Sequence, residues 1–234
     1  MGKEDLVSNN PLRALGLEKE GGATGRRVGL IMARAGLGKT AILVQIAMDS
    51  MLRDNNVLHV AIGEGVEKTR AWYDDILDLM NQEKKVENFQ QLVDEVMKNR
   101  MIMTFKESAF SRPRLEERLN DLILQDIFKP NCLVIDGFDF EDAKREDLED
   151  IKDLLDAMSM QAWFSAVSHR NDDRVSPTGV PAPCNEIDDL FDTVVLLKPE
   201  QEMIQLDIIR NNGETVEDTG GLALDPTTMM VKKG

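Results

Sequence analysis

Residues 28–52 read VGLIMARAGLGKTAILVQIAMDSML: an apolar run, a turn of small residues and a second apolar run in close succession. The first run, Val28–Ala33, has the length and composition of a buried strand. The second run, from Ala41 to Leu52, has the length of a helix. A strand followed at once by a helix predicts the first unit of a mostly parallel sheet that is covered by helices.

Similar apolar runs recur along the rest of the chain, and helical patterns separate the first five runs, from Val28–Ala33 to Trp163–Ser168. The further strands that we predict are Val57–Ile62, Met101–Phe105, Cys132–Asp136, Trp163–Ser168, Thr193–Lys198 and Ile204–Arg210. In one of the helical patterns, Leu115, Leu119 and Leu122 form one apolar face, and Ser111 stands at the position of an N-cap. The last two strands follow one another without a helix, which predicts an antiparallel hairpin at the C-terminal edge of the sheet.

These patterns predict a single α/β domain over residues 1–234, a length that is sufficient for one large core. Residues 1–20 form a lead-in to the first strand. Residues 171–186 contain Pro177, Pro181 and Pro183, so that we expect a mobile surface loop there rather than a helix.

The composition excludes several classes of protein. The chain has 28 Lys and Arg against 43 Asp and Glu, a formal net charge of −15, which repels nucleic acid and anionic membranes. No apolar run is long enough to span a membrane, and the N-terminus does not have the apolar core of a secretory signal. The two cysteines, Cys132 and Cys184, give no disulfide framework. We therefore expect a cytoplasmic protein that does not bind membranes.

The turn of small residues has the pattern of a phosphate-binding loop. In such a loop successive backbone N–H groups curl around phosphate oxygens, and the following helix presents its positive N-terminal end. Lys39 would lie against the β- and γ-phosphates, and the Thr40 hydroxyl would complete the shell of a Mg²⁺ ion. The predicted binding residues are Ala33, Arg34, Ala35, Gly36, Leu37, Gly38, Lys39, Thr40 and Ala41.

Three further residues follow predicted strands and suit the same chemistry. Asp136 ends an apolar strand and would bind the metal, although an Asp at a strand end also commonly starts a loop. Glu64 follows the second strand between two glycines and would activate water; Glu67 is an alternative, and an exposed loop Glu is the simpler interpretation. His169 would contact the γ-phosphate, or lie on the surface. His59, inside an apolar strand, we interpret as a core residue with satisfied hydrogen bonds.

In this order, these residues resemble the RecA superfamily of P-loop ATPases, and within it the KaiC-like and DnaB-helicase-like group. The similarity runs from about Asn10 to Met230, and the phosphate loop is close to its form in replicative helicases. By this resemblance Glu64 falls at the catalytic Glu, Asp136 at the Walker B acid and His169 at a γ-phosphate sensor. Further similar segments are Gly21-Gly22 with Gly25, Asp192-Thr193-Val194-Val195 and Asn212-Gly213.

The resemblance implies a RecA-like core, ATP with Mg²⁺, and a homo-oligomeric ring or filament with the active site at a subunit interface. Helicase-like members place Lys and Arg before the Asn-Gly turn, where this chain has Ile209 and Asn211, with Arg210 between them. Because successive side chains of a strand point to opposite faces, Arg210 would reach a neighbour's γ-phosphate only across a bulge. The alternative is an exposed strand Arg.

We therefore expect a Mg-dependent ATPase that acts as a cytosolic motor or switch, with a nucleotide-gated regulatory module of little hydrolysis as the alternative. A nucleic-acid motor is less well supported, because the loop from Asn171 has one Arg beside two Asp and no aromatic residue for stacking. Residues 139–156 have nine acidic and three basic residues. They form either a solvated helix face or a surface for a basic protein partner.

Overall fold

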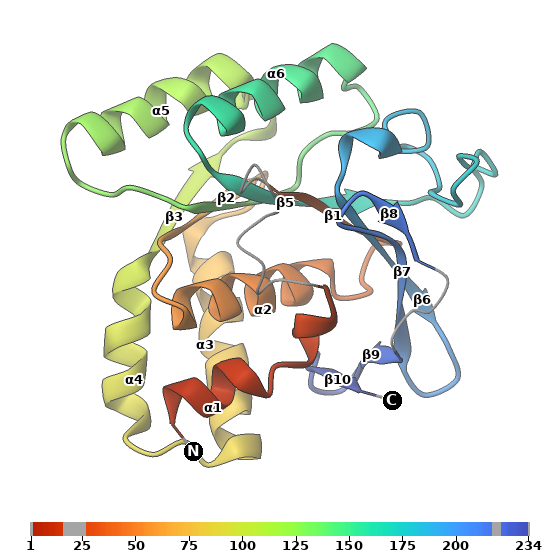
Figure 1. Ribbon diagram of the computed structural model, residues 1–234. Helices are drawn as coiled ribbons and strands as arrows, with labels where there is room; N and C mark the ends of the chain where they lie inside the picture. Colours follow the sequence, from red (N-terminus) through yellow and green to blue (C-terminus); the bar gives the residue numbers. More distant parts are fainter. Residues whose placement is uncertain (1, 16–26, 217–220, 234) are drawn as a thin grey trace.

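The computed structural model describes residues 2–15, 27–216 and 221–233. These residues form an α/β fold in which one mixed sheet of mostly parallel strands is flanked by helices on both faces (Figure 1). The strands are β1 (Val28–Ala33), β2 (Val57–Ile62), β3 (Arg100–Phe105), β4 (Cys132–Asp136), β5 (Gln161–Val167), β6 (Thr193–Pro199), β7 (Ile204–Asn211), β8 (Glu214–Thr215), β9 (Leu222–Leu224) and β10 (Val231–Lys233).

The order of the strands across the sheet is β10-β9-β7-β6-β1-β5-β4-β2-β3, with β8 paired to β7. β1 is central: it pairs in parallel with β5 on one side and with β6 on the other. β4, β2 and β3 continue the parallel part, whereas β7, β9 and β10 run antiparallel to their neighbours. The predicted hairpin is confirmed as β6–β7, but three short strands that were not predicted, β8, β9 and β10, lie on that side of the sheet.

Helices cover the sheet in two groups (Figure 1). One face carries α1 (Lys3–Ser8), α2 (Lys39–Leu52), α3 (Val66–Lys84) and α4 (Phe89–Val96); the other carries α5 (Arg112–Leu124) and α6 (Arg145–Ala157). Short 3₁₀ turns lie at Pro11–Leu15, Met97–Asn99, Glu107–Ala109 and Asp188–Leu190. β1 contributes to both cores: Ile31 packs toward α2, and Leu30 packs toward the α5–α6 face. A strand that is buried on both faces explains the continuous apolar run.

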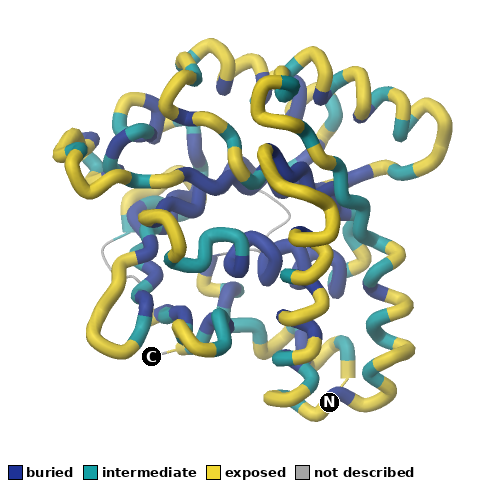
Figure 2. Tube along the Cα trace, turned by 180° about the vertical axis from the view of Figure 1, so that it is seen from behind, coloured by how far each residue is buried: buried dark blue, intermediate teal, exposed yellow. Residues whose placement is uncertain are grey.

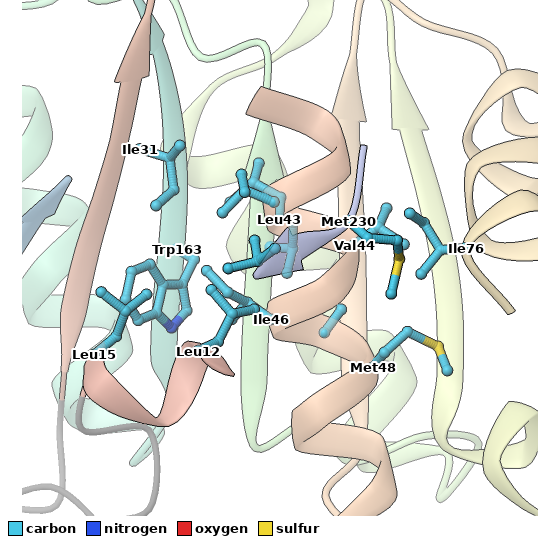
Figure 3. Packing of buried hydrophobic residues seen from close by; sticks show 14 of the residues in the cluster. Leu12, Leu15, Ile31, Leu43, Val44, Ile46, Met48, Ile76, Trp163 and Met230 are labelled. Carbon is cyan, nitrogen blue, oxygen red and sulfur yellow. The ribbon is translucent and has the colours of Figure 1, made fainter. Parts of the chain in front are cut away.

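α2 is the most enclosed helix, since every residue from Ala41 to Leu52 is buried. Figure 3 shows Leu43 and Ile46 of α2 close to Trp163 of β5 and to Leu12 of the lead-in. Figure 2 shows the buried centre of the fold in dark blue and the exposed outer sides of the surrounding helices in yellow. The burial of α2 from Ala41 onward fixes the position of the loop that precedes the helix.

The predicted strands are all present, with bounds that differ from the prediction by at most two residues. Segment 171–186 contains no helix, and its loop packs inward through Ser176, Val180 and Cys184. Gly21, Gly22 and Gly25, which precede the first strand, lie outside the described residues. Across the three described ranges, no helix has both the length and the apolar composition needed to cross a membrane.

Candidate functional site

The carboxyl ends of four parallel strands meet at one edge of the sheet. Ala33 of β1 is in register with Val167 of β5, and Asp136 of β4 is in register with Ala61 of β2. The Ser168 N–H donates to Ala33 O at 3.0 Å, which joins the start of the phosphate loop to the end of β5. The strand ends that were predicted to carry the site therefore share one edge.

The loop between β1 and α2 has the backbone shape that its glycines allow. Gly36 and Gly38 have φ angles of 79° and 90°, in the left-handed region. A Cβ on Gly38 would also lie 2.6 Å from Leu224 Cδ2 of β9. At the tip of the loop, the residues that face solvent are Arg34, Ala35 and Gly36, whereas Ala33 and Ala41 are buried and Leu37 to Thr40 are half-buried.

The start of α2 has the features of an anion site. No side chain caps the helix at Gly38, and its first turn contains no acidic residue. The first N–H groups of a helix have no partner within the helix, and the helix dipole is positive there. A phosphate group placed in the loop would therefore meet backbone donors and a favourable field.

Lys39 lies inside the loop. Its ammonium donates to Ala33 O and Arg34 O, both at 3.4 Å, so that it holds the loop and stands close to where a phosphate would bind. Burial lowers the pKa of Lys39, and the carboxylate of Asp136 acts in the opposite direction. These long hydrogen bonds to neutral carbonyls can be exchanged for contacts with an anionic ligand.

Thr40 and Asp136 are brought into direct contact. The Thr40 hydroxyl donates to Asp136 Oδ2 at 2.7 Å, from the start of α2 to the end of β4. Ser165 of β5 donates to the other oxygen, Oδ1, and its own Oγ accepts the Gly137 N–H at 3.2 Å. Hydrogen bonds to both oxygens fix the orientation of the carboxylate.

Ser165 is the residue of this site that sequence reasoning missed. It is 3 % exposed in a strand whose neighbours, Phe164 and Ala166, are apolar and buried. The signal was present in the sequence, because a hydroxyl in the middle of an apolar strand needs a partner when it is buried. Its partner is the carboxylate that was assigned to the metal.

Glu64 follows β2 and therefore lies at the same edge of the sheet. Its carboxylate forms an ion pair with Lys68, one turn later, and its side chain is 50 % exposed. β2 is separated from β1 by β5 and β4. Glu67 is more exposed and lies 3.9 Å from Arg70. The structure thus places both candidate bases on the rim, and among the described residues neither contacts the loop.

His169 follows β5, the strand beside β1. Its Nε2 lies 2.5 Å from Glu141 Oε1, and both side chains are more than half exposed. His59 is fully buried; its Nδ1 lies 3.0 Å from the Tyr73 hydroxyl, but within the described residues its Nε2 has no hydrogen-bond partner. The prediction of a fully satisfied His59 was therefore wrong. Burial lowers its pKa to about 4, which keeps the ring neutral.

Arg210 lies at the opposite edge of the sheet. It pairs with Val194, which in turn pairs with Leu30 near the start of β1. The strand register does shift between Val194 and Val195, but the guanidinium turns to Asp188, with Nη2 at 3.4 Å from Oδ2 and Nη1 at 2.5 Å from its carbonyl. Only 12 % of the Arg210 side chain is exposed. The structure therefore contradicts the alternative of an exposed strand Arg.

Among the residues that the structure describes, no three His, Cys, Asp or Glu side chains come together in a way that could hold a metal ion. Thr40 and Asp136 could still hold Mg²⁺, because this ion commonly takes one or two protein ligands and completes its shell with water and phosphate oxygens. The loop and these two residues together suit a phosphate ester with its metal.

A scan against models of known protein families finds no match to this chain, and a search of curated proteins finds none either. The function has to be inferred from the geometry of the site.

Proposed function

We propose that the chain binds ATP with Mg²⁺ in the loop from Ala33 to Thr40 and hydrolyses it. The observation that carries this proposal is the 2.7 Å hydrogen bond between Thr40 Oγ1 and Asp136 Oδ2. It joins the two residues that a Mg-nucleotide site requires, at the end of a loop with uncapped backbone donors and an enclosed Lys39. ATP as the nucleotide rests on the family resemblance.

The order of the strands supports a RecA-like core as the more specific fold. β5 lies between β1, which carries the loop, and β4, which carries Asp136. The mixed order is compatible with a RecA-like arrangement, and the resemblance of the motifs favours it over other nucleotide-binding sheets. On this proposal the protein is a cytosolic ATPase that acts as a motor or switch in a homo-oligomeric ring or filament.

Glu64 is the residue that we propose as the base that activates water. It lies on the correct rim, and its ion pair with Lys68 is exposed, so that little free energy is needed to break it. His169 would contact the γ-phosphate after it leaves Glu141. Both assignments require these side chains to leave their present ion pairs.

A second candidate is a nucleotide-gated interaction module with little hydrolysis. The specific observation in its favour is that Glu64, His169 and Arg210 are all engaged within the chain, with Lys68, Glu141 and Asp188. A subunit with these contacts would bind nucleotide without having its catalytic groups in place.

The test is to measure Mg-dependent binding and hydrolysis of ATP by the wild type, Lys39→Ala and Lys106→Ala over a range of protein concentrations. Lys106 is exposed at the end of β3, so that its variant controls for the loss of a positive charge. We expect only Lys39→Ala to lose both activities. Binding with negligible turnover at every concentration would favour the interaction module, and unchanged binding by Lys39→Ala would overturn the proposed site.

A further inference from the structure

A groove of about 890 Å³ opens between the α5 and α6 ends that face the site edge of the sheet. Figure 1 shows α5 and α6 side by side on the same face. Ile62, at the end of β2, and Gly137, directly after β4, form part of its inner wall. The volume falls in the range of pockets that hold a small ligand or a few side chains.

The floor of the groove is aromatic. Phe110 and Phe138 line it, both half-buried, with ring centroids 5.8 Å apart and an edge-to-face angle of 89°. Phe138 also packs on the buried Phe164, with the two ring centroids 5.7 Å apart. These neighbours hold the rings of the floor while leaving part of each ring accessible from the groove.

The rim of the groove is acidic. Asp139, Asp142, Asp147 and Asp150 line it from the segment after β4 and from the first turns of α6. Asp139 and Asp147 accept backbone N–H groups, from Glu141 at 3.0 Å and from Lys144 at 2.9 Å, and these neutral donors leave the negative charges in place. Among the described residues, none of the four carboxylates forms an ion pair.

Within the described part of the chain, the one basic residue of the lining is Arg112 of α5, and its guanidinium is engaged by Glu116. The charge of the groove is therefore negative, in a protein whose net charge is already −15. Phosphate backbones and anionic lipids are repelled by such a surface, whereas a cation is attracted. The half-buried rings add an apolar surface that a hydrated inorganic cation would not use.

We propose that this groove binds an arginine-bearing, partly apolar segment of a partner protein. A guanidinium is planar, stacks on aromatic faces and pairs with carboxylates through two hydrogen bonds, which suits phenylalanine rings beneath aspartates. Apolar side chains of the same segment would cover the rest of the floor. A lysine-rich segment or a polyamine would be attracted by the carboxylates but has no planar group to stack on the phenylalanine rings.

This inference goes beyond the proposed function, because the groove and the phosphate loop are separate surfaces. They are nevertheless connected: Gly137 in the wall of the groove follows Asp136 directly, and its N–H is hydrogen-bonded to Ser165. A bound segment would contact the backbone that positions the proposed metal ligand.

The experiment measures binding of a fluorescein-labelled synthetic peptide, in which arginines alternate with leucines, by anisotropy at fixed ionic strength and without nucleotide. The groove variant is Asp142→Asn with Asp150→Asn. The matched control is Glu146→Gln with Asp153→Asn, two exposed acids of α6 outside the groove. The net charge changes equally in the two variants, and each retains the phosphate loop.

We expect the groove variant to bind about 5-fold more weakly than the wild type and the control variant less than about 2-fold more weakly, as for the loss of exposed charge pairs. Equal weakening in both variants would overturn the proposal, because it would show attraction to the acidic surface in general. Since no nucleotide is present, this result is independent of whether the protein hydrolyses ATP.

The aromatic floor is tested with a second peptide and a mild substitution. A peptide of arginines and serines should bind more weakly than the arginine–leucine peptide, and Phe110→Leu should remove most of that difference. Equal binding of the two peptides to the wild type would overturn the role of the floor. The other possible occupant is a second copy of the chain, which sedimentation of the wild type and the groove variant would test. Weaker self-association of the groove variant, without any loss of peptide binding, would assign the groove to that second copy and overturn the proposal.

Discussion

The two ends of β1 contain similar polar groups in very different states. At the carboxyl end, Arg34, Ala35 and Gly36 are exposed, and the N-terminal N–H groups of α2 are not capped by a side chain. Lys39 donates only to backbone carbonyls at 3.4 Å. The N–H groups of α2 and the Lys39 ammonium can therefore donate to a ligand at this end.

At the amino end the cationic side chains are already paired with other groups of the chain. Arg27 is 4 % exposed and donates to Leu15 O at 2.9 Å and to Asn212. Arg210 is held by Asp188. A cation that is enclosed and paired in this way contributes to the fold, whereas binding a ligand requires one that can change partners.

The largest effect is expected at the carboxyl end. Asp136→Asn should reduce Mg-dependent ATP turnover about 1000-fold, or about 4 kcal/mol, because the metal loses its charged ligand. Steady-state hydrolysis measures this. Asp121→Asn, an exposed acid of α5, is the control for charge. Turnover by Asp136→Asn within a factor of about 10 of the wild type would show that the carboxylate is not a metal ligand.

Arg210→Met should affect stability instead. The substitution leaves the Asp188 carboxylate, whose side chain is 11 % exposed, without its cation, and should lower the free energy of unfolding by about 3 kcal/mol. Urea unfolding measures this. Arg174→Met breaks an exposed pair with Asp172 and should leave the urea midpoint of unfolding nearly unchanged. If Arg210→Met were fully stable but inactive in the oligomer, Arg210 would be a catalytic group after all.

Ser165→Ala should have a smaller effect, on the orientation of Asp136. Loss of the hydrogen bond to Oδ1 should weaken Mg²⁺ affinity, so that nucleotide binding needs an Mg²⁺ concentration about 10-fold higher, as for other groups that orient a metal ligand. The measurement is a Mg²⁺ titration with a fluorescent ATP analogue. Ser168→Ala, at the end of the same strand, is the control. An unchanged titration would limit Ser165 to packing.

The smallest effect concerns acid stability. The pKa of His59 is about 4 in the folded protein, below its ordinary value of 6.5. The unfolded chain therefore takes up the proton first as the pH falls, so that the contribution of neutral His59 is complete above about pH 6.5 and is lost toward pH 4. Between pH 7 and pH 5.5 the wild type should lose about 1 kcal/mol.

His59→Gln should remove this dependence, which urea unfolding at the two pH values would show. If the variant had the same slope as the wild type, other groups would account for the acid sensitivity. Tyr73→Phe removes the partner of Nδ1 and should retain most of the slope, since burial is the main cause of the lowered pKa.

Much of the fold was predictable because its longer strands stand out in the sequence, six of them as mostly apolar runs and β7 by its alternation of apolar and polar residues. Glu214–Thr215, Leu222–Leu224 and Val231–Lys233 were missed because two or three residues are too few to show a period. Ser111 does precede α5 as predicted, but its side chain makes no capping hydrogen bond. The position of a strand or helix along the chain was easier to predict than the hydrogen-bond partner of a side chain.

The same distinction applies to the candidate site. The phosphate loop was predictable because its geometry is local: two glycines, a helix start and the residues between them. The partners of Glu64, His169 and Arg210 were not predicted, because His169 and Arg210 meet residues brought close only by the tertiary fold. The Glu64–Lys68 pair is the exception, since a spacing of four residues near a helix start would have indicated it.

The central place of β1 in the sheet also affects how the chain can fold while it is being synthesised. Val28 pairs with Ala162, and Gly29 with Thr193, so that during synthesis β1 has neither of its partner strands until Gln161–Val167 and Thr193–Pro199 have followed. During that time the apolar residues of α2 have no complete core to enter, which favours aggregation of the nascent chain. Interrupted synthesis before Gln161 should therefore leave an insoluble fragment, with the phosphate loop present in sequence but not in shape.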